Sequence, residues 1–407
     1  MKIALPITSF LPNLGGMEVG AHNLAKNLLS LGHEPIVITS YSIFRKLKKK
    51  KISLPYKVIC FYPLILSIFN INHKLGLFLS EKYLRLLQRI YNFDFWHITM
   101  AFPLGVMFIN YAKKNNFSNF IIRAVGEDIQ YNKELKYGYS LIEKNKKMMK
   151  SFLPQCNNFI SISDSISRVY RSLGISSKSI HHIPNGVSIN RFKPLSLKKR
   201  NQLKKKYKLK NDLPIFITLG RNHPKKKLDF ILKLVKRMSL GKKQFKFLIV
   251  GQGVAKLQEK VNLYNISEHI ILIDTSNEIY DEINDFPPLK IIEYLSISDF
   301  FVFPSILESF GVVLIEAMAA GLPTIANNVP GCRDIILDNK TGFLSKKNND
   351  INTYLEKINL LMNNISLVRK MKKRCFVESR KYDWEKICKE YLKLYKKILV
   401  NNLNNLI

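Results

Sequence analysis

Short apolar runs alternate with longer amphipathic segments through the first half of the chain. The apolar runs predict strands at 2–6, 35–39, 95–98, 120–123 and 158–162. A helix is predicted over 19–30, where apolar residues recur at helical spacing and Gly32 follows. Strands that are apolar on both faces and are separated by helices are typical of a parallel sheet with both faces covered.

The same alternation restarts after a turn signal at Ile183-Pro184-Asn185-Gly186 and a basic, polar segment at 196–210. Further strands are predicted at 215–219, 245–250, 270–273, 300–303 and 323–326, with helices at 228–238 and 384–400. A chain of 407 residues suits two domains of roughly 200 residues better than one core. We therefore expect an α/β fold of two Rossmann-like domains that face each other across a cleft. Residues 1–193 and 194–380 form these domains, and residues 381–407 form a C-terminal helix that crosses back to the first.

The chain is strongly basic, with 65 Lys and Arg against 30 Asp and Glu, a formal net charge of +35. Such a charge favours anionic partners, namely nucleic acid, anionic lipid headgroups or a phosphate-bearing substrate. A genome whose base composition favours Lys, Asn and Ile codons would explain the abundance of basic residues equally well. It would not explain why these residues cluster at 45–51, 198–210 and 225–227. The helix and zinc signatures of nucleic-acid-binding modules are absent, so we expect no nucleic-acid partner.

The cysteines and the apolar segments bear on where the protein works. Five cysteines, widely scattered and without a C-x-x-C pair, indicate free thiols in a reducing cytosol. The apolar run at the N-terminus is too short for a signal peptide, and no apolar run reaches 18 residues, so no membrane-spanning helix is predicted. We expect a cytoplasmic protein.

Two carboxylates stand out where the predicted strand 300–303 leads into a helix expected from about 311 to 320. Glu308 lies in the connecting loop, and Glu316 lies within an otherwise apolar helix. Ser309 is a candidate N-cap, which would leave the N–H groups of Phe310, Gly311 and Val312 free for a phosphate. A carboxylate inside an apolar helix needs a partner, and sugar hydroxyls are suitable donors. An ordinary strand–helix unit with one capping and one surface Glu is the alternative.

This pattern resembles the E-x7-E signature of family 4 glycosyltransferases, which have the GT-B fold. Further resemblances occur in order along nearly the whole chain, at Gly15-Gly16-Met17-Glu18, Ile183-Pro184-Asn185-Gly186-Val187, Gly220-Arg221 with Lys225-Lys226-Lys227, Pro330-Gly331-Cys332-Arg333, Thr341-Gly342-Phe343 and Tyr382-Asp383-Trp384. The resemblance implies a retaining glycosyltransferase that moves a sugar from a nucleotide-sugar donor to a glycan or lipid-linked acceptor, in bacterial cell-surface polysaccharide synthesis.

The resemblance also implies roles for residues of the second domain. Glu316 would hold the donor ribose hydroxyls, and Glu308 would lie near the hydroxyls of the transferred sugar. Arg221 and Lys226 would neutralise the departing diphosphate, since no D-x-D motif is placed to hold a metal; we expect neither a metal nor a cofactor. Lys225 competes with Lys226 for this role. Lys227 stands where the family usually has glycine, which puts close backbone packing there in doubt.

The first domain would hold the acceptor. Gly15 and Gly16 would form a tight loop near the donor phosphate. Glu127 and Asp128 follow Gly126 in a sequence that resembles the family's H-G-x-D element, but Val125 replaces its His. His97, at the end of a predicted strand, is a candidate to face the cleft instead. The alternative for His97 is a structural histidine whose hydrogen bonds are satisfied within the protein. The alternative for Asp128 is a carboxylate that stabilises the start of a helix.

Three other interpretations are compatible with the sequence. The lysine-rich segments, including residues 2–57, are compatible with docking on the anionic inner face of the cell membrane, or simply with a solvated surface. Val125 is compatible with a family member that has lost catalysis and serves as a binding subunit. Another GT-B enzyme, such as a phosphorylase or a sugar-nucleotide epimerase, is the third alternative.

Overall fold

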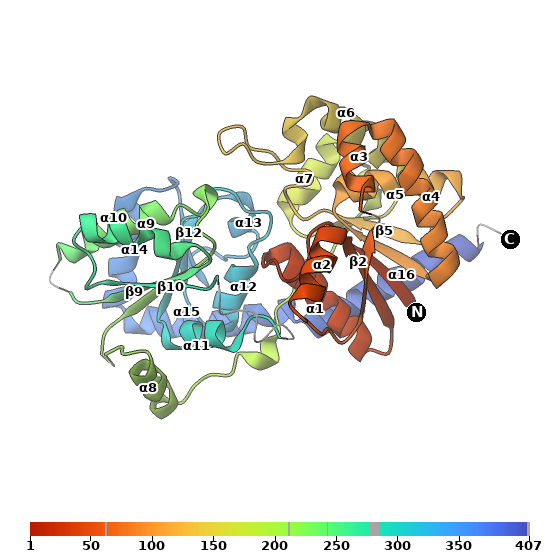
Figure 1. Cartoon of the computed structure of the whole chain (residues 1–407). Helices are drawn as coiled ribbons and strands as arrows, with labels where there is room; N and C mark the ends of the chain where they lie inside the picture. Colours follow the sequence, from red (N-terminus) through yellow and green to blue (C-terminus); the bar gives the residue numbers. More distant parts are fainter. Residues whose placement is uncertain (62, 211, 242, 277–284, 405–407) are drawn as a thin grey trace. The chain divides into compact units, whose positions relative to one another are not determined.

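The computed structural model describes residues 1–61, 63–210, 212–241, 243–276 and 285–404. The chain forms two compact units (Figure 1). The first contains Met1–Asn185 and the C-terminal segment from Trp384, and the second contains Gly186–Asp383. The chain thus passes between the units at 185/186 and 383/384, a few residues from the boundaries at 193/194 and 380/381 expected from the sequence.

The first unit is built on a seven-stranded parallel sheet with the order β3-β2-β1-β4-β5-β6-β7. Its strands are β1 (Lys2–Pro6), β2 (Glu34–Ser40), β3 (Lys57–Phe61), β4 (Phe95–Thr99), β5 (Phe120–Arg123), β6 (Phe159–Ser161) and β7 (Ile180–His182). The central strands are buried along nearly their whole length, which is why they appear in the sequence as continuous apolar runs.

Helices cover both faces of this sheet. They are α1 (Gly16–Ser30), α2 (Tyr41–Lys49), α3 (Ile65–Ile71), α4 (His73–Tyr91), α5 (Val106–Lys114), α6 (Glu143–Phe152), α7 (Asp164–Ser172) and α16 (Trp384–Asn404). The C-terminal helix α16 packs against α1. It also reaches strand β4, where the Tyr395 hydroxyl lies 2.6 Å from Nδ1 of His97.

The second unit repeats the plan with a six-stranded parallel sheet in the order β10-β9-β8-β11-β12-β13. Its strands are β8 (Ile215–Leu219), β9 (Lys246–Gly251), β10 (Ile270–Asp274), β11 (Phe300–Phe303), β12 (Thr324–Asn327) and β13 (Gly342–Ser345). Its helices are α8 (Leu197–Lys206), α9 (Leu228–Ser239), α10 (Gln258–Leu263), α11 (Leu289–Ile297), α12 (Val312–Ala319), α13 (Pro330–Arg333), α14 (Ile351–Asn363) and α15 (Ile365–Ser379).

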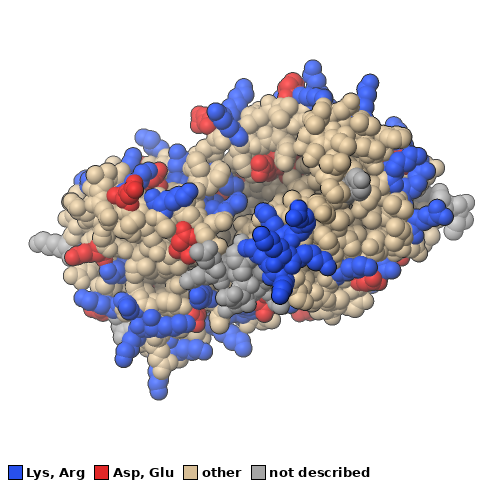
Figure 2. All heavy atoms as spheres, in the orientation of Figure 1, with Lys and Arg blue, Asp and Glu red and all other residues tan. Residues whose placement is uncertain are grey.

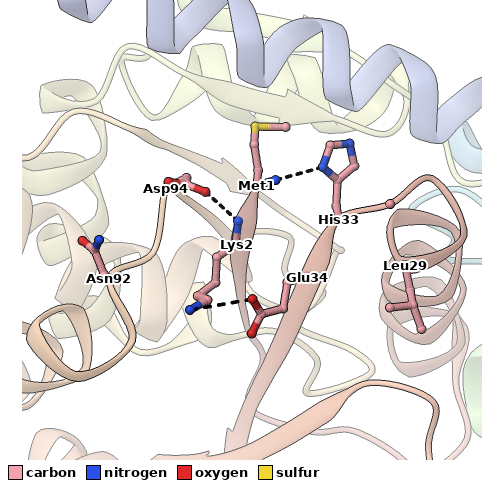
Figure 3. Close-up of a pocket in the computed structure, with 8 residues that line it drawn as sticks. Met1, Lys2, Leu29, His33, Glu34, Asn92 and Asp94 are labelled. Carbon is pink, nitrogen blue, oxygen red and sulfur yellow. Dashed lines mark hydrogen bonds and ion pairs between the residues drawn. The ribbon is translucent and has the colours of Figure 1, made fainter.

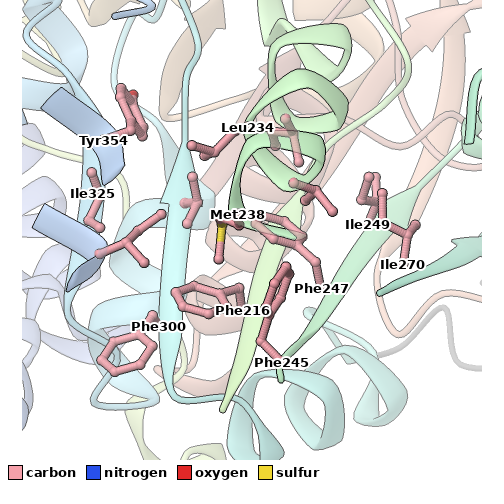
Figure 4. Close-up of a cluster of buried hydrophobic side chains, with 14 of the residues drawn as sticks. Phe216, Leu234, Met238, Phe245, Phe247, Ile249, Ile270, Phe300, Ile325 and Tyr354 are labelled. Carbon is pink, nitrogen blue, oxygen red and sulfur yellow. The ribbon is translucent and has the colours of Figure 1, made fainter. Parts of the chain in front are cut away.

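One apolar cluster fills the space between this second sheet and the helices α9, α14 and α15 (Figure 4). Phe216 on β8 lies at its centre, with ring centroids 5.2 Å from Phe300 and 5.9 Å from Phe247. Tyr354 of α14 closes the cluster against Phe230 of α9. This packing fixes the ends of strands β8, β11 and β12, from which the loops discussed below emerge.

The sequence did not predict the short strands β3, β7 and β13, and helix α8 is among the helices that it did not predict. Strands β3, β7 and β13 have five, three and four residues, too few for a clear pattern. The basic segment 196–210 contains helix α8, which has no apolar stripe of its own. Ser196 caps this helix, and Arg200 binds the Ile297 carbonyl at 2.7 Å and Asp299 at 2.8 Å. Tertiary contacts with α11, rather than periodicity, therefore stabilise α8.

No helix in the described part of the chain is both long enough and apolar enough to cross a bilayer.

Candidate active site

Loops from neighbouring strands of the second unit meet at one edge of its sheet. The loop after β8 bonds to the loop after β9 through Asn222 N–H and the Gln252 carbonyl, at 2.9 Å. It also bonds to the loop after β11, through Ile306 N–H and the Lys225 carbonyl, at 2.9 Å. Because the carboxyl ends of parallel strands share an edge, this is where such folds bind ligands.

Lys226 and Glu308 form an ion pair within this loop cluster. Nζ of Lys226 lies 2.5 Å from Oε1 of Glu308, and the Ser305 hydroxyl donates to the same oxygen at 2.9 Å. The side chains are only 15% and 9% exposed. The ammonium also lies 4.6 Å from the centroid of the Phe303 ring.

The pair bears on the charge of Glu308 and distinguishes the two lysines by their contacts. Burial raises the pKa of this carboxyl, but the charges of Lys226 and Lys225 and the hydrogen bonds from Lys226 and Ser305 outweigh it, so its pKa lies below the usual value. Lys226, not Lys225, is the lysine that pairs with Glu308. Its charge is partly neutralised in the absence of ligand, which the sequence did not indicate.

Lys227 occupies a backbone conformation that suits glycine. Its φ of 51° and ψ of 44° are left-handed, and the residue caps helix α9. Glycine reaches this region without steric cost, whereas lysine is strained there. A left-handed turn, rather than close packing, is therefore the feature that would favour glycine at this position.

Helix α12 begins within one residue of its predicted start, but its N-cap differs from the prediction. Its first residue is Val312, and its N-cap is Gly311, not Ser309. Gly311 has a φ of 89°, and a Cβ there would lie 2.8 Å from Cδ1 of Leu314. The N–H groups of Val312 and Val313, both partly exposed, therefore have no partner within the helix.

The loop residues before α12 also differ from expectation. The Phe310 side chain is 4% exposed and packs edge-on against Tyr382, with 5.9 Å between ring centroids. Phe310 thus anchors the loop through its ring. The helix start lies one residue beyond the one from which N–H groups of Phe310, Gly311 and Val312 were predicted to bind a phosphate, because the left-handed Gly311 ends the loop.

Glu316 is a buried carboxyl group without a hydrogen-bond or ion-pair partner among the described residues. It lies on α12 with 7% exposure, and it makes no hydrogen bond or ion pair with any residue in the described part of the chain. Burial alone raises its pKa to about 8. An unpaired buried carboxyl is costly, so this position favours a ligand that brings hydrogen-bond donors.

Arg221 extends from the same edge of the sheet. It is exposed and pairs with no residue among those described. Its backbone is held by close approach of two loops, since a Cβ on Gly251 would lie 2.0 Å from the Gly220 carbonyl oxygen and 3.2 Å from Arg221 N. Arg221 therefore presents a free guanidinium from a fixed position.

Sequence reasoning missed two residues that hold the Glu308 loop. Asn327, fully buried at the end of β12, donates through Nδ2 to the Pro304 carbonyl at 2.7 Å and accepts the Tyr354 hydroxyl at 3.1 Å. A Cβ on Gly331 would lie 2.8 Å from Cβ of Glu308. A polar residue at the carboxyl end of an apolar strand was a usable signal for Asn327; the contact of Gly331 was not visible in the sequence.

The glycine loop of the first unit lies at the carboxyl end of β1, as its place in the sequence predicted. Gly15 is the N-cap of α1 in an extended conformation, and Gly16 is exposed. Glu18 accepts the Ser9 hydroxyl at 2.7 Å, and Ser9 accepts Asn13 Nδ2 at 3.2 Å. These contacts organise the loop between β1 and α1.

His97, a candidate to face the cleft, does not face solvent. It is completely buried between Tyr395 and Tyr391 of α16, and burial holds its pKa well below the usual value. The alternative of a structural histidine is correct, because the C-terminal helix covers the face of β4 that the sequence left open.

Asp128 is also buried, and its oxygens are occupied by backbone groups. Oδ2 accepts Ala101 N–H at 2.6 Å, and Oδ1 accepts Val125 N–H at 3.0 Å and Gly126 N–H at 2.8 Å. Asp128 therefore joins the loops after β4 and β5 instead of contacting an acceptor. Glu127, beside it, is exposed.

A pocket of about 550 Å³ lies away from these loops, at the amino ends of β1 and β2 (Figure 3). Its polar groups pair with one another: the Met1 amino group lies 3.2 Å from Nδ1 of His33, and Lys2 N–H donates to Asp94 at 2.6 Å. The Lys2 ammonium lies 3.7 Å from Glu34. Among the residues described, no three His, Cys, Asp or Glu side chains gather in a way that could hold a metal ion.

The two units, each with a parallel sheet, define a two-domain α/β protein, and the comparisons give its family. Residues 199–376 match the model of the glycosyl transferases group 1, and residues 14–191 match the model of glycosyltransferase family 4. The chain belongs to the group 1, family 4 glycosyltransferases, as the sequence motifs predicted.

Relatives and solved structures agree with this assignment. N-acetyl-alpha-D-glucosaminyl L-malate synthase of Bacillus anthracis is 24% identical over 99% of both chains. UDP-Gal:alpha-D-GlcNAc-diphosphoundecaprenol alpha-1,3-galactosyltransferase of Escherichia coli is 27% identical over 46% of each chain. HepE of Anabaena, solved with UDP and glucose, has a TM-score of 0.74 at 15% identity and covers 97% of this chain and 99% of its own. The predicted GT-B fold is confirmed.

Proposed function

We propose that this glycosyltransferase moves a sugar from a nucleotide-sugar donor to a glycan or lipid-linked acceptor with retention of anomeric configuration, and that it needs no metal. The observation that carries the donor assignment is Glu316, a buried carboxylate with no partner in the described chain and a pKa of about 8. Ribose hydroxyls would supply the hydrogen bonds that Glu316 lacks.

The charge of the donor diphosphate would be met by groups of the second unit. Arg221 offers an unpaired guanidinium, which binds phosphate oxygens bidentately. The first N–H groups of α12 add partial positive charge. Lys226 would interact with the leaving phosphate as well as with Glu308. Glu308 would accept hydrogen bonds from hydroxyls of the transferred sugar.

The state of Glu308 supports retention without a protein nucleophile. Its Oε1 accepts both Lys226 and Ser305, so this carboxylate is held in place and its negative charge is balanced. We propose that the acceptor oxygen bonds to the anomeric carbon on the face from which the diphosphate leaves. The acceptor proton then passes to the departing phosphate oxygen.

The acceptor would bind at the first unit, beside the Gly15–Gly16 loop. The Escherichia coli relative is named for a diphosphoundecaprenol acceptor, and HepE was solved in complex with UDP and glucose. On the basis of these two proteins, we propose that this chain acts in cell-surface polysaccharide synthesis at the inner face of the membrane. Glu127 is exposed and remains a candidate for contact with the acceptor. His97 and Asp128 are no longer candidates, because both are buried.

Turnover against a panel of UDP-, GDP- and ADP-sugars tests the proposal. We expect one class of donor to be consumed, and Glu316→Ala and Arg221→Ala each to lower transfer by about tenfold or more while the fold is kept. Wild-type turnover in both variants would refute the donor site. The anomeric configuration of the product, read by NMR, tests retention, and turnover after exhaustive chelation tests metal independence.

A further inference from the structure

The connection between β5 and α6 of the first unit contains a hairpin. It spans residues 124–142, far more than the roughly 2–6 residues that usually join a strand to a helix. Asn132 N–H donates to the Tyr137 carbonyl at 2.8 Å, and Tyr137 N–H donates to the Asn132 carbonyl at 3.0 Å. Figure 1 shows this connection as a loop that projects from the body of the first unit beside α6. Because it leaves the carboxyl end of β5, it lies at the edge where parallel sheets bind ligands.

The base of the hairpin is held in one conformation. Gly138 has a φ of 101°, and a Cβ there would lie 1.9 Å from the Gln130 carbonyl oxygen and 2.9 Å from Cα of Tyr131. Gln130 N–H in turn donates to the Gly126 carbonyl at 2.7 Å. The hairpin is therefore joined directly to the loop that Asp128 organises, and its base cannot shift without breaking these contacts.

Tyr131 is a large aromatic side chain that this rigid base leaves 50% exposed. Helix α6 braces the ring, since Nζ of Lys146 lies over it, 5.9 Å from the ring centroid. Leu141 and Ile142, at the other end of the same connection, are 36% and 58% exposed. The connection thus presents an aromatic ring and two aliphatic side chains to the outside of the unit, where a ligand can reach them.

The tip of the hairpin is charged. Lys133, Glu134 and Lys136 are exposed there. Figure 2 shows basic and acidic side chains together on this projecting part of the first unit. Charges of both signs keep the tip hydrated, so the aromatic ring at its base is the group that distinguishes this surface.

We propose that Tyr131 is a stacking platform for a sugar ring of the acceptor. One face of a pyranose presents C–H groups, which pack on the electron-rich face of an aromatic ring while the hydroxyls stay in water. A tyrosine on a fixed hairpin has few torsions left to lose, so binding costs little conformational entropy. The ligand class is a neutral hexopyranose, because stacking uses the ring and requires no charge.

This inference rests on the proposed function, in which the first unit holds the acceptor. It adds that the first unit recognises the carbohydrate part of the acceptor, through a side chain outside the Gly15–Gly16 loop. Lys146 would act as a positioning residue, because its ammonium contacts the ring of Tyr131.

Steady-state kinetics at saturating donor test the inference, with octyl glycosides of glucose, galactose, mannose and N-acetylglucosamine as acceptor probes. We expect Tyr131→Ala to raise the KM for the acceptor by about tenfold or more, with kcat and the KM for the donor little changed. Tyr131→Phe should keep the wild-type KM, because stacking needs the ring and not the hydroxyl. Tyr41→Ala, at a 41% exposed tyrosine of α2 in the same unit, is the matched control and should behave like the wild type.

A second measurement does not depend on turnover. Trp96 and Trp384 are 0% and 3% exposed, so Tyr131→Trp adds a tryptophan whose surroundings differ from theirs. We expect a glycoside of the same panel to shift the emission of Tyr131→Trp and to protect it from quenching by acrylamide. The wild-type protein, titrated in the same way, gives the baseline.

Three outcomes would overturn the inference. They are an unchanged acceptor KM in Tyr131→Ala, an emission of Tyr131→Trp that no glycoside alters, and a loss of activity in Tyr131→Ala that only follows a lowered unfolding midpoint. If the donor is consumed while the acceptor KM of Tyr131→Ala is unchanged, the platform alone is wrong. If the wild type consumes no nucleotide-sugar while glycosides shift the emission of Tyr131→Trp, the proposed function is wrong and the platform is upheld.

Discussion

Gly331 lies against Glu308 so closely that a single methyl group cannot fit between them. A Cβ at Gly331 would meet Cβ and the carbonyl oxygen of Glu308 at 2.8 Å each. The start of α13 therefore sets the position of the carboxylate that binds Lys226. A residue without a side chain thus helps to shape the site.

Replacement of Gly331 by alanine should displace the Glu308 loop. We expect Gly331→Ala to lower kcat/KM by about tenfold, with a stability cost of about 1–3 kcal/mol from overpacking. Gly241→Ala is the control, because its added Cβ meets only the Met238 carbonyl, at 3.3 Å. Full activity in Gly331→Ala would mean that the position of Glu308 does not limit transfer.

Removal of Lys226 should destabilise the second unit, because it leaves the buried Glu308 without its counter-charge. We expect Lys226→Met to cost about 3 kcal/mol in urea unfolding at pH 7. The pKa of Glu308 is lowered in the folded state, so this stability is present above the unfolded pKa and is lost as the pH falls through the folded value.

The double variant Lys226→Met with Glu308→Gln should recover much of this loss, because it removes both charges. Lys233→Met, at an exposed position on α9, serves as the control. Strictly additive losses in the double variant would contradict a coupled ion pair.

Binding of the donor should release a proton from Glu316. Its pKa of about 8 makes the free carboxyl largely protonated at pH 7, and bonding to ribose hydroxyls would favour the ionised form. Titration calorimetry in buffers of different ionisation enthalpy should reveal this proton, and Glu316→Gln should abolish the buffer dependence. Buffer-independent enthalpies in the wild type would argue against this role.

The same raised pKa has a consequence for stability. The folded state holds the Glu316 proton more tightly than the unfolded chain, so the contribution of this group falls as the pH rises from about 4 to 8. Glu316→Gln should therefore be more stable than the wild type at pH 8 and above. The unfolding midpoint of both proteins between pH 5 and 9 measures this.

Asn327 should act as a positioning residue for the Glu308 loop. Asn327→Ala removes the donor to the Pro304 carbonyl and should lower kcat more than it raises KM, whereas Tyr354→Phe removes only the hydroxyl that Asn327 accepts and should have a smaller effect. Equal losses from both variants would indicate general damage to the core.

His97 should matter for stability and not for transfer. Tyr395→Phe leaves Nδ1 of the buried His97 without its partner and should cost about 1–3 kcal/mol, with kcat unchanged once the protein is folded. The pKa of His97 is lowered in the folded state, so the unfolded chain binds more protons below about pH 6.5 and stability falls there. A specific loss of acceptor affinity in Tyr395→Phe would restore His97 to the site.

Some features of this protein could be read from local sequence alone. The apolar runs located β1, β5, β8 and β11 to the residue, because central strands of a parallel sheet are buried on both faces. The order of the motifs gave the family, and the place of Glu316 within an apolar helix marked a carboxylate in need of a ligand. Each of these depends on neighbours along the chain.

The tertiary structure decided what depends on residues distant in sequence. It chose Lys226 over Lys225 for Glu308, covered His97 with α16, filled both oxygens of Asp128 with backbone N–H groups and placed Gly331 against Glu308. Pattern and composition record whether a position is apolar or polar. They do not record which polar group, tens or hundreds of residues away, occupies its hydrogen-bonding capacity, and that occupancy separates a residue free to bind substrate from one that holds the fold.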